Sequence, residues 1–315
     1  MTKKKIIIIS GPTATGKTQL SLDLARKFSL PIVNADSLLF YKELNIGVAK
    51  PSQDDLNSVP HHLINVASIT EPLNAKTYRD LALVTFDKIW TKNPSQTIIL
   101  AGGSGFYIKA LLYGMYDSET ITPEVQQRSD TLYRVDGITP FLEILKTHDP
   151  ISFKKLHAND HYRVRRAVEH WWLTNTAFSE VGQNLAKKNS ENPFWKEQGW
   201  ELLILYTDMP KEIHHDLIVK RTNHMLDIGL IEEVKNLLKH FTGTEKPLQS
   251  IGYREVQDYL SGKIQSLDDL KFAIIISTRQ LAKAQRTWFA NMEKIELTYP
   301  QFFVEAEKLC QKFLI

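Results

Sequence analysis

Gly11-Pro-Thr-Ala-Thr-Gly-Lys-Thr18 has the spacing of a phosphate-binding loop, in which two glycines enclose four residues and a Lys-Thr pair follows the second glycine. The apolar run 5–10 comes directly before it and predicts a buried strand. A helical pattern at 18–28 comes directly after it. Because a strand, this loop and a helix in that order are the context the motif requires, the sequence predicts a bound di- or triphosphate here.

Each part of this loop has a chemical reason to hold phosphate. Its backbone amides can form an anion-binding nest, and the helix that follows points its positive end at the phosphate. Lys17 adds a positive charge, and the Thr18 hydroxyl is a candidate ligand for Mg²⁺. The expected diphosphate contacts are Gly11, Pro12, Thr13, Ala14, Thr15, Gly16, Lys17 and Thr18. The loop alone leaves a kinase and a prenyltransferase equally open, since ATP and a prenyl diphosphate both present a diphosphate.

Short β-branched runs alternate with helical patterns along the rest of the chain. The further predicted strands are 31–34, 62–66, 97–101 and 201–206, and the further predicted helices are 76–90, 211–228 and 267–290. This alternation predicts an α/β fold with a parallel sheet. Strand patterns disappear after Gly114 and return after Gly199, which indicates a helical insertion. We therefore divide the chain into a first core part at 1–115, an insertion at 116–199, and a second core part at 200–315 with one strand and then helices.

The composition is that of an ordinary globular protein, with 315 residues, 43% hydrophobic and 24% charged. A single cysteine, Cys310, excludes an internal disulfide framework. The apolar run that follows Lys3-Lys4-Lys5 is too short for a signal peptide, and no stretch approaches the roughly 18–20 apolar residues of a membrane helix. We expect a cytoplasmic monomer with no membrane contact. A net charge of +3 does not by itself indicate a nucleic-acid partner.

Two polar motifs follow other predicted strands. Asp36 and Ser37 come after the strand at 31–34, and Gly102-Gly-Ser-Gly105 comes after the strand at 97–101. Ligands of open parallel sheets bind outside the carboxyl ends of the strands, so we expect both motifs beside the phosphate-binding loop. Asp36 could remove a proton there, and the Ser104 hydroxyl could hold a reacting group. The simpler alternative is that either residue only caps a helix.

Basic residues gather on two predicted helices. Arg163, Arg165 and Arg166 crowd one helix of the insertion, where Arg163 and Arg166 share a face that could meet phosphates. Arg279, Lys283 and Arg286 form a second stripe near the C-terminus, which favours contact with RNA or diphosphate. A solvated helix face is the alternative for the first group.

A series of short motifs spans nearly the whole chain: Gly11 to Thr18, Asn34-Ala-Asp-Ser37, Tyr41, Ile46-Gly-Val-Ala-Lys-Pro51, Pro60-His-His-Leu63, Gly102-Gly-Ser-Gly-Phe-Tyr107, Asn159-Asp-His-Tyr-Arg-Val-Arg-Arg-Ala-Val-Glu169, Met225-Leu with Gly229, Ile251-Gly-Tyr253, Thr278-Arg-Gln-Leu-Ala-Lys283 and Thr287-Trp288. In this order and spacing they resemble the bacterial tRNA dimethylallyltransferases. The resemblance implies a P-loop NTPase-like parallel-sheet core with a helical insertion that contacts tRNA. It also implies dimethylallyl diphosphate, tRNA and Mg²⁺ as partners, with transfer to the exocyclic amine of the adenosine 3′ of the anticodon.

The resemblance assigns roles to particular residues. Asp36 would be the general base, Ser104 would position the amine, and Lys17 would stabilise the leaving diphosphate together with Arg221. The implied metal ligand is Thr18. The implied tRNA contacts are Asp36, Ser37, Leu38, Leu39, Tyr162, Arg163, Val164, Arg165, Arg166, Arg279 and Lys283.

Three positions depart from the pattern of that family. Leu39 stands where a glutamine reads the target base, Leu217 stands where an arginine is usual, and Ser104 replaces a threonine but keeps the hydroxyl. An aliphatic side chain at 39 cannot form hydrogen bonds to a base. The sequence therefore supports an active enzyme with modified tRNA preference. It leaves open a divergent tRNA-binding paralogue without activity and a prenyltransferase that acts on free AMP. A small-molecule or nucleotide kinase, with Asp36 as base and Arg163 and Arg166 in its lid, is a further alternative.

Overall fold

The computed structural model describes residues 3–115 and 121–315. The chain forms two compact units. One consists of Met1–Leu112 together with Gln198–Ile315, and the other of Tyr113–Glu197. We refer to them as the core unit and the insertion unit. The boundaries expected from the sequence, after residues 115 and 199, lie within three residues of these divisions.

The core unit is built on a parallel sheet with the strand order β3-β2-β4-β1-β5-β6. The strands are β1 (Lys4–Ser10), β2 (Ile32–Asn34), β3 (His61–His62), β4 (Ile98–Ala101), β5 (Trp200–Thr207) and β6 (Ile295–Leu297). In the centre, Ile6 of β1 is in register with Ile98 on one side and with Leu202 on the other. The predicted α/β fold with a parallel sheet is confirmed.

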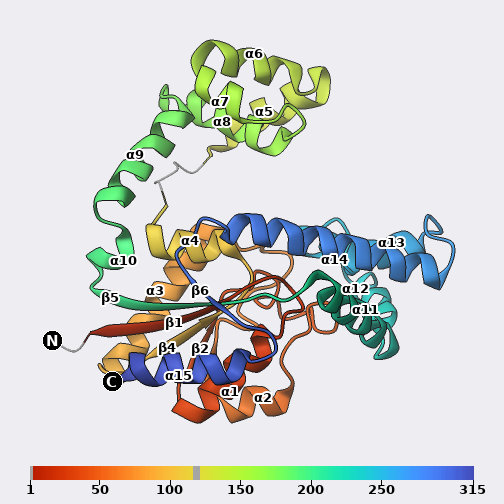
Figure 1. Cartoon of the computed structure of the whole chain (residues 1–315). Helices are drawn as coiled ribbons and strands as arrows, with labels where there is room; N and C mark the ends of the chain where they lie inside the picture. The colour runs from red at the N-terminus through yellow and green to blue at the C-terminus, as the bar shows by residue number, and fades with distance from the viewer. Residues whose placement is uncertain (1–2, 116–120) are drawn as a thin grey trace. The chain divides into compact units, whose positions relative to one another are not determined.

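Helices cover both faces of this sheet, as Figure 1 shows. Because side chains alternate along a strand, Ile7 and Ile9 of β1 face one layer, where they pack with α1 (Lys17–Phe28) and α15 (Phe302–Leu314). The opposite layer contains α3 (Ala75–Lys92) and α4 (Gly105–Tyr113). There Phe86 of α3 packs edge-on against Trp200 of β5, with 5.6 Å between ring centroids. Burial on both faces explains why β1 reads as an uninterrupted apolar run.

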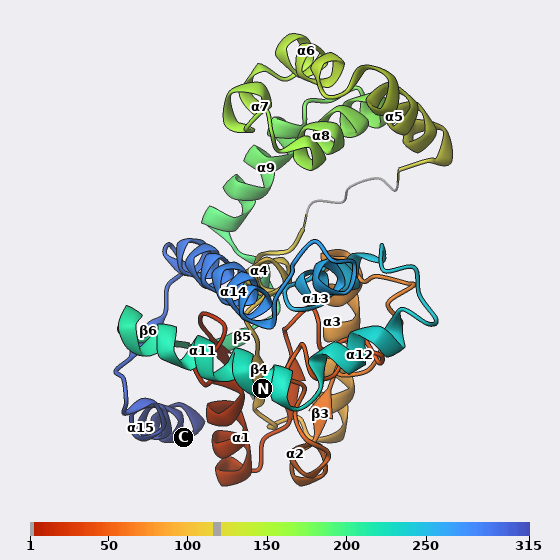
Figure 2. The same cartoon turned by 90° about the vertical axis from the view of Figure 1, so that its right-hand side faces the viewer.

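The helices α11 (Lys211–Asp227), α12 (Leu230–Leu237), α13 (Tyr253–Leu260) and α14 (Leu267–Phe289) stand near the carboxyl ends of the strands, with a short 3₁₀ turn at Lys246–Gln249. The short helix α2 (Gln53–Ser58) instead precedes β3 and contacts α1, where Arg26 pairs with Asp55. α11 and α14 pack against each other (Figure 2). The Ser266 hydroxyl fixes the start of α14 by accepting a hydrogen bond from the backbone N–H of Asp269.

Two details of the predicted sheet are wrong. The strand expected at 62–66 ends at His62, because Leu63 and Asn65 adopt positive φ angles of 61° and 58°, which leave the extended region. The chain after β5 is also not entirely helical, since β6 adds an edge strand. Ile295 and Glu296 of β6 are exposed, so its three residues form no apolar run that a sequence pattern could detect.

The described part of the insertion unit is helical. Its elements are α5 (Pro123–Asp136), α6 (Thr139–His148), α7 (Pro150–Lys155), α8 (His161–Thr174), α9 (Phe178–Glu191) and α10 (Phe194–Glu197). The unit has its own apolar core of Phe141, Leu145, Val164, Ala167 and Val168. Throughout the two described ranges of the chain, no helix combines the length and the apolar content that crossing a bilayer demands.

Candidate active site

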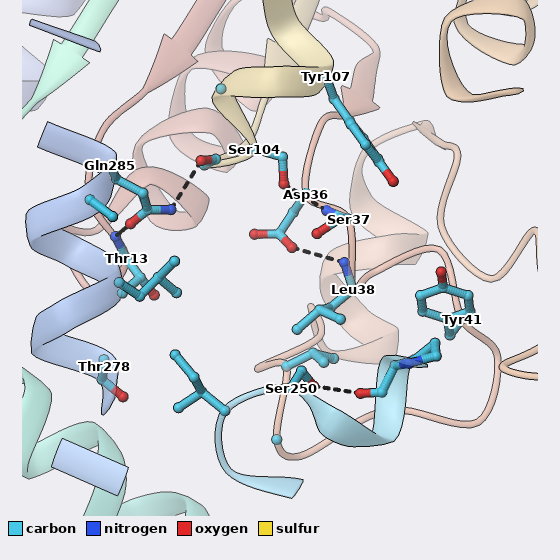
Figure 3. A pocket seen from close by; sticks show the side chains of 18 of the residues that line it. Thr13, Asp36, Ser37, Leu38, Tyr41, Ser104, Tyr107, Ser250, Thr278 and Gln285 are labelled. Atoms are coloured by element: carbon cyan, nitrogen blue, oxygen red, sulfur yellow. Dashed lines mark hydrogen bonds between the residues drawn. The ribbon is translucent and has the colours of Figure 1, made fainter. Parts of the chain in front are cut away.

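A cavity of about 540 Å³ opens at the carboxyl ends of the strands in the core unit. Thr13 of the phosphate-binding loop, Asp36 from the turn after β2, and Ser104 from the turn after β4 line it. Gln285 of α14, which lies beside Thr13, and Arg221 of α11 also line it (Figure 3 labels all of these except Arg221). The sheet topology therefore brings the three strand-end motifs together in space.

The phosphate-binding loop has the backbone that its glycines permit. Gly11 and Gly16 have φ angles of 149° and 86°. A Cβ atom on Gly11 would collide with the carbonyl of Thr207 at the end of β5, so only glycine fits there. The Thr15 hydroxyl closes the loop on itself with a 2.8 Å bond to the Pro12 carbonyl and meets the Thr207 hydroxyl at 2.7 Å.

Lys17 lies at the first position of α1. Its Nζ donates to the Pro12 carbonyl at 2.6 Å. Burial lowers the pKa of Lys17 from 10.5 to about 8, while the Asp36 carboxylate acts in the opposite direction and Arg221 lowers the pKa further. The ammonium is therefore still charged at pH 7 but poorly solvated, which strengthens its attraction to an anion in the cavity.

The Asp36 carboxylate points into the cavity (Figure 3). The backbone N–H of Asp36 donates to the side-chain oxygen of Asn34 at 2.8 Å, and Asp36 Oδ1 accepts from the N–H of Leu38 at 3.1 Å. This is a turn, and the next helix begins only at Gln53, with Ser52 as its cap. The alternative that Asp36 caps a helix is therefore wrong.

Ser104 directly precedes α4, and its hydroxyl oxygen accepts from the backbone N–H of Ser37 at 2.9 Å. The hydroxyl thus ties the turn after β4 to the turn that carries Asp36, and it keeps its own proton for a further bond. Gly102 allows the two turns to approach, because a Cβ atom there would collide with the Ala35 carbonyl.

Arg221 and Gln285 bring the C-terminal helices to the loop. Gln285 Oε1 accepts from the N–H of Thr13 at 2.7 Å, and its Nε2 donates to the Gly103 carbonyl at 3.0 Å. Arg221 Nη1 lies 3.5 Å from the Thr13 hydroxyl. Burial lowers the pKa of Arg221, and Asp36 opposes that shift. Asp36 therefore acts electrostatically on both cations of the site, Lys17 and Arg221.

Sequence reasoning did not find Gln285 as a site residue. It lies seven positions after Thr278, which also lines the cavity, so both residues share one face of α14. The spacing of these two polar residues along α14 was the sign in the sequence that could have identified Gln285. Tyr107 was likewise missed: it stacks on Tyr78 at 4.9 Å, donates to the Leu73 carbonyl at 3.0 Å and has its pKa raised by burial to about 12.

Apolar side chains supply most of the remaining wall. Ile218 and Met225 come from α11, and Ile274 comes from α14. Phe106 and Trp288, which also line the cavity, have exposed fractions of 56% and 38%. The site thus combines charged groups at the loop, an apolar wall and solvent-accessible aromatic rings.

The expected tRNA contacts of the core unit are placed unequally. Leu38 lines the cavity together with Asp36 and Ser37, but Leu39 does not, and its carbonyl accepts from Asn65 N–H at 3.2 Å. Arg279 and Lys283 are exposed on α14. Arg286 departs from their stripe, because its guanidinium binds both oxygens of Asp208, with Nη2 2.7 Å from Oδ1 and Nε 2.8 Å from Oδ2.

In the insertion unit, Tyr162 and Arg163 are exposed, with Arg163 Nε 3.3 Å from Asp160. Arg165 bonds to Ser129 and pairs with Asp130, which joins α8 to α5. The remaining arginine, at 166, pairs with Glu169. Val164 is fully buried in the unit's core, so the expected contact between tRNA and this side chain is wrong.

The sequence predicts Thr18 as the protein ligand of a Mg²⁺ ion at the loop. The residues that the structure describes include no group of three or more His, Cys, Asp or Glu side chains able to hold a metal. Mg²⁺ in phosphate-binding sites takes only one or two protein oxygens and completes its shell with phosphate oxygens and water. Thr18, exposed in the first turn of α1, is placed to offer such an oxygen.

Comparison with known proteins identifies the family of the chain. Residues 39–292 match the family described as IPP transferase. The chain is 37% identical over 303 residues to tRNA dimethylallyltransferase 1 of Citrifermentans bemidjiense, covering 96% of this chain and 94% of that relative.

Solved structures have the same overall fold. The full-length tRNA isopentenylpyrophosphate transferase of Bacillus halodurans superposes with a TM-score of 0.69 at 26% identity, covering 99% of this chain and 97% of that one. A eukaryotic dimethylallyltransferase acting on tRNA has a TM-score of 0.81 at 23% identity, over 98% of this chain and 77% of that one, and shares the fold. The chain belongs to the IPP transferase family of prenyltransferases.

Proposed function

We propose that this chain transfers a dimethylallyl group from dimethylallyl diphosphate to the exocyclic amine of the adenosine 3′ of the anticodon in tRNA. The observation that carries the proposal is the position of the Asp36 carboxylate, in one cavity with the phosphate-binding loop and the Ser104 hydroxyl. A base and an anion cradle in the same pocket suit an amine that attacks a carbon bearing a diphosphate. The relatives that cover nearly the whole chain are named for this activity.

The loop and its cations would hold the diphosphate. Loop amides, Lys17 and Arg221 offer preorganised positive charge where the leaving group gains negative charge, which is the arrangement that stabilises such a transition state. Bound Mg²⁺, held by Thr18 and diphosphate oxygens, would supply further charge neutralisation. Ile218 and Met225, which lie on the same helix as Arg221, would face the apolar dimethylallyl group.

The proton and electron balance assigns Asp36 its role. The bond between the first allylic carbon and the diphosphate oxygen breaks, and its electron pair leaves with the diphosphate. The amine nitrogen of adenine forms the new bond to that carbon, and its proton passes to the Asp36 carboxylate. The Ser104 hydroxyl, whose oxygen already accepts from Ser37 N–H, would donate a hydrogen bond to the adenine and orient it.

The tRNA would be held at the rim of the cavity and by the insertion unit. An adenine reaches a closed pocket only when it leaves the base stack, and exposed aromatic rings can replace the lost stacking. Phe106 and Trp288 are such rings. Arg279 and Lys283 on α14 and Arg163 on α8 carry exposed charges suited to RNA phosphates. With an aliphatic Leu39 set outside the cavity lining, we propose that polar groups of the lining read the base: Ser37, Ser104, Ser250 and Thr278.

An acceptor panel tests the proposal. Purified protein is incubated with Mg²⁺, labelled dimethylallyl diphosphate and one acceptor at a time: unmodified tRNA, the same tRNA with guanosine at the target position, or free AMP. Label in the unmodified tRNA alone supports the proposal. Label in AMP would move the assignment to a free-nucleotide prenyltransferase, and formation of ADP from ATP with a nucleoside acceptor would move it to a kinase. Binding of tRNA without transfer would indicate an inactive paralogue.

A further inference from the structure

Thr13, the third residue of the phosphate-binding loop, is held by the C-terminal helices at each of its polar groups. Its N–H donates to Gln285 of α14 at 2.7 Å. Its carbonyl lies 2.7 Å from Nε2 of His214 on α11, and its hydroxyl lies 3.5 Å from Arg221 on the same helix. The orientation of this part of the loop therefore depends on side chains some two hundred or more residues away in sequence.

The contacts of His214 define its protonation state. The side chain is buried, with an exposed fraction of 3%. A carbonyl only accepts hydrogen bonds, so Nε2 must carry the proton that reaches Thr13. A guanidinium only donates, so Nδ1, 2.8 Å from Nη2 of Arg286, must be unprotonated. His214 is therefore neutral and present as a single tautomer.

Arg286 is itself fixed by a carboxylate. Asp208, directly after β5, accepts three hydrogen bonds from the Arg286 guanidinium at 2.7–3.1 Å. A continuous line of bonds thus runs from Asp208 through Arg286 and His214 to the carbonyl of Thr13. The line joins β5, α14, α11 and the loop, and none of its three side chains lines the cavity.

This line of bonds acts on the part of the loop that faces the diphosphate. A backbone carbonyl turned toward phosphate oxygens would repel them, whereas an N–H would attract them. A carbonyl bonded to His214 is not free to turn that way. Resting on the proposed function, we propose that His214 and Arg286, anchored by Asp208, are positioning residues for the diphosphate, which hold the Thr13 carbonyl out of the anion site.

The charges around His214 give this role a pH signature. Arg286 from α14 and Lys17 from α1 oppose protonation of the imidazole, while Asp208 after β5 and the Thr13 carbonyl favour it. Burial is the largest effect and lowers the pKa of His214 below 6.5. As the pH falls through that pKa, Nδ1 gains a proton facing the Arg286 donor, and the line of bonds breaks.

The test uses the full chain and separates the two substrates. His214→Leu and Arg286→Leu each remove one link, and Lys271→Leu is the matched control, because it removes a cation of α14 that pairs only at the surface with Asp268. We expect the two test variants to raise the KM for dimethylallyl diphosphate about tenfold or more, with the KM for tRNA within about twofold of wild type and the control unchanged. A fall in melting temperature with both KM values unchanged would show that the residues serve stability alone and would overturn the proposal.

The pH dependence of diphosphate binding is the second measurement, and it tests the proposal even if His214→Leu or Arg286→Leu folds poorly. His214→Gln keeps a donor for the Thr13 carbonyl but cannot be protonated. Affinity for inorganic diphosphate is measured by calorimetry between about pH 5 and 7.5, the range in which histidine titrates. Both proteins experience the titration of diphosphate itself, so the difference between them reports His214. We expect wild type to lose affinity toward acid pH more steeply than the variant, and parallel curves would refute the role.

Direct binding also distinguishes this inference from the proposed function. If wild type binds diphosphate but transfers no label to tRNA, the proposed function fails, while weaker diphosphate binding by His214→Leu and Arg286→Leu still supports the positioning role. If wild type binds no diphosphate, both are overturned.

Discussion

Replacing Asp36 with asparagine isolates the proton-accepting role of its carboxylate. Asparagine has the same shape, and its Oδ1 can still accept the 3.1 Å bond from Leu38 N–H. The turn after β2 should therefore persist, and the free energy of unfolding should change by no more than about 1 kcal/mol. What the variant loses is the ability to take a proton from the attacking amine.

The two kinetic constants should respond differently. A positioned general base contributes about 10²–10⁴-fold to rate, so kcat should fall by that factor, which is about 2.7–5.4 kcal/mol in the activation barrier. Asp36 is also the negative charge that Lys17 and Arg221 experience in the site. Removing it leaves both cations more attractive to diphosphate, so the KM for dimethylallyl diphosphate should stay equal or fall.

The assay is transfer of labelled dimethylallyl groups to tRNA at pH 7, with each substrate varied in turn. Asp54→Asn is the control, because Asp54 is exposed on α2, away from the cavity lining. A kcat within about threefold of wild type would refute the assignment of the base. A higher KM for dimethylallyl diphosphate with unchanged kcat would show that Asp36 serves binding instead.

Three further predictions concern the loop, the rim and the cavity wall. Because the pKa of Lys17 is about 8, its charge is present below that pH and lost above it. The affinity of wild type for inorganic diphosphate, measured by calorimetry, should therefore fall above about pH 8. The affinity of Lys17→Arg should persist there. Phe106→Ala should cost about 1–3 kcal/mol of stacking and raise the KM for tRNA about 5-fold to 150-fold without changing the KM for dimethylallyl diphosphate. The Glu233 carboxylate accepts hydrogen bonds from the three backbone N–H groups of residues 45–47 and from the Tyr253 hydroxyl. Glu233→Gln should therefore lower the free energy of unfolding, measured in urea, by about 2–4 kcal/mol. Glu232→Gln is the control and should not lower it, because Glu232 only forms an exposed ion pair with Lys235.

The sequence predicted the part of the site that depends on strand ends. Asp36, Ser104 and the phosphate-binding loop each follow a strand of a parallel sheet, and parallel strands place their carboxyl ends at one edge. Their meeting in one cavity follows from topology alone, without knowledge of side-chain packing. The short strands were harder: β6 has exposed side chains and β3 ends where positive φ angles begin, and neither property appears in an apolar pattern.

The contributions of the helices could not be predicted in the same way. A basic stripe on α14 gives no sign that Arg286 turns inward to Asp208 while Lys283 stays exposed, because this depends on how α14 packs against α11. The same limit applies in α8, where Val164 enters the core directly after the exposed Arg163, and Arg165 reaches across to α5. In the turn after β2, only the backbone path decides that Leu38 and not Leu39 meets the cavity.

The position of the insertion unit between β4 and β5 has a consequence for biosynthesis. All contacts that build the unit lie within one continuous stretch, Tyr113–Glu197, so it can fold as soon as that stretch has left the ribosome. The central strand β1 must wait for β5 to arrive before it is paired on both sides, with Lys4 opposite Trp200. Thr13 must wait longer still, until Gln285 has been synthesised. The phosphate-binding loop is therefore synthesised long before the helices that hold Thr13, and in a nascent chain it lacks these contacts until α14 has been made.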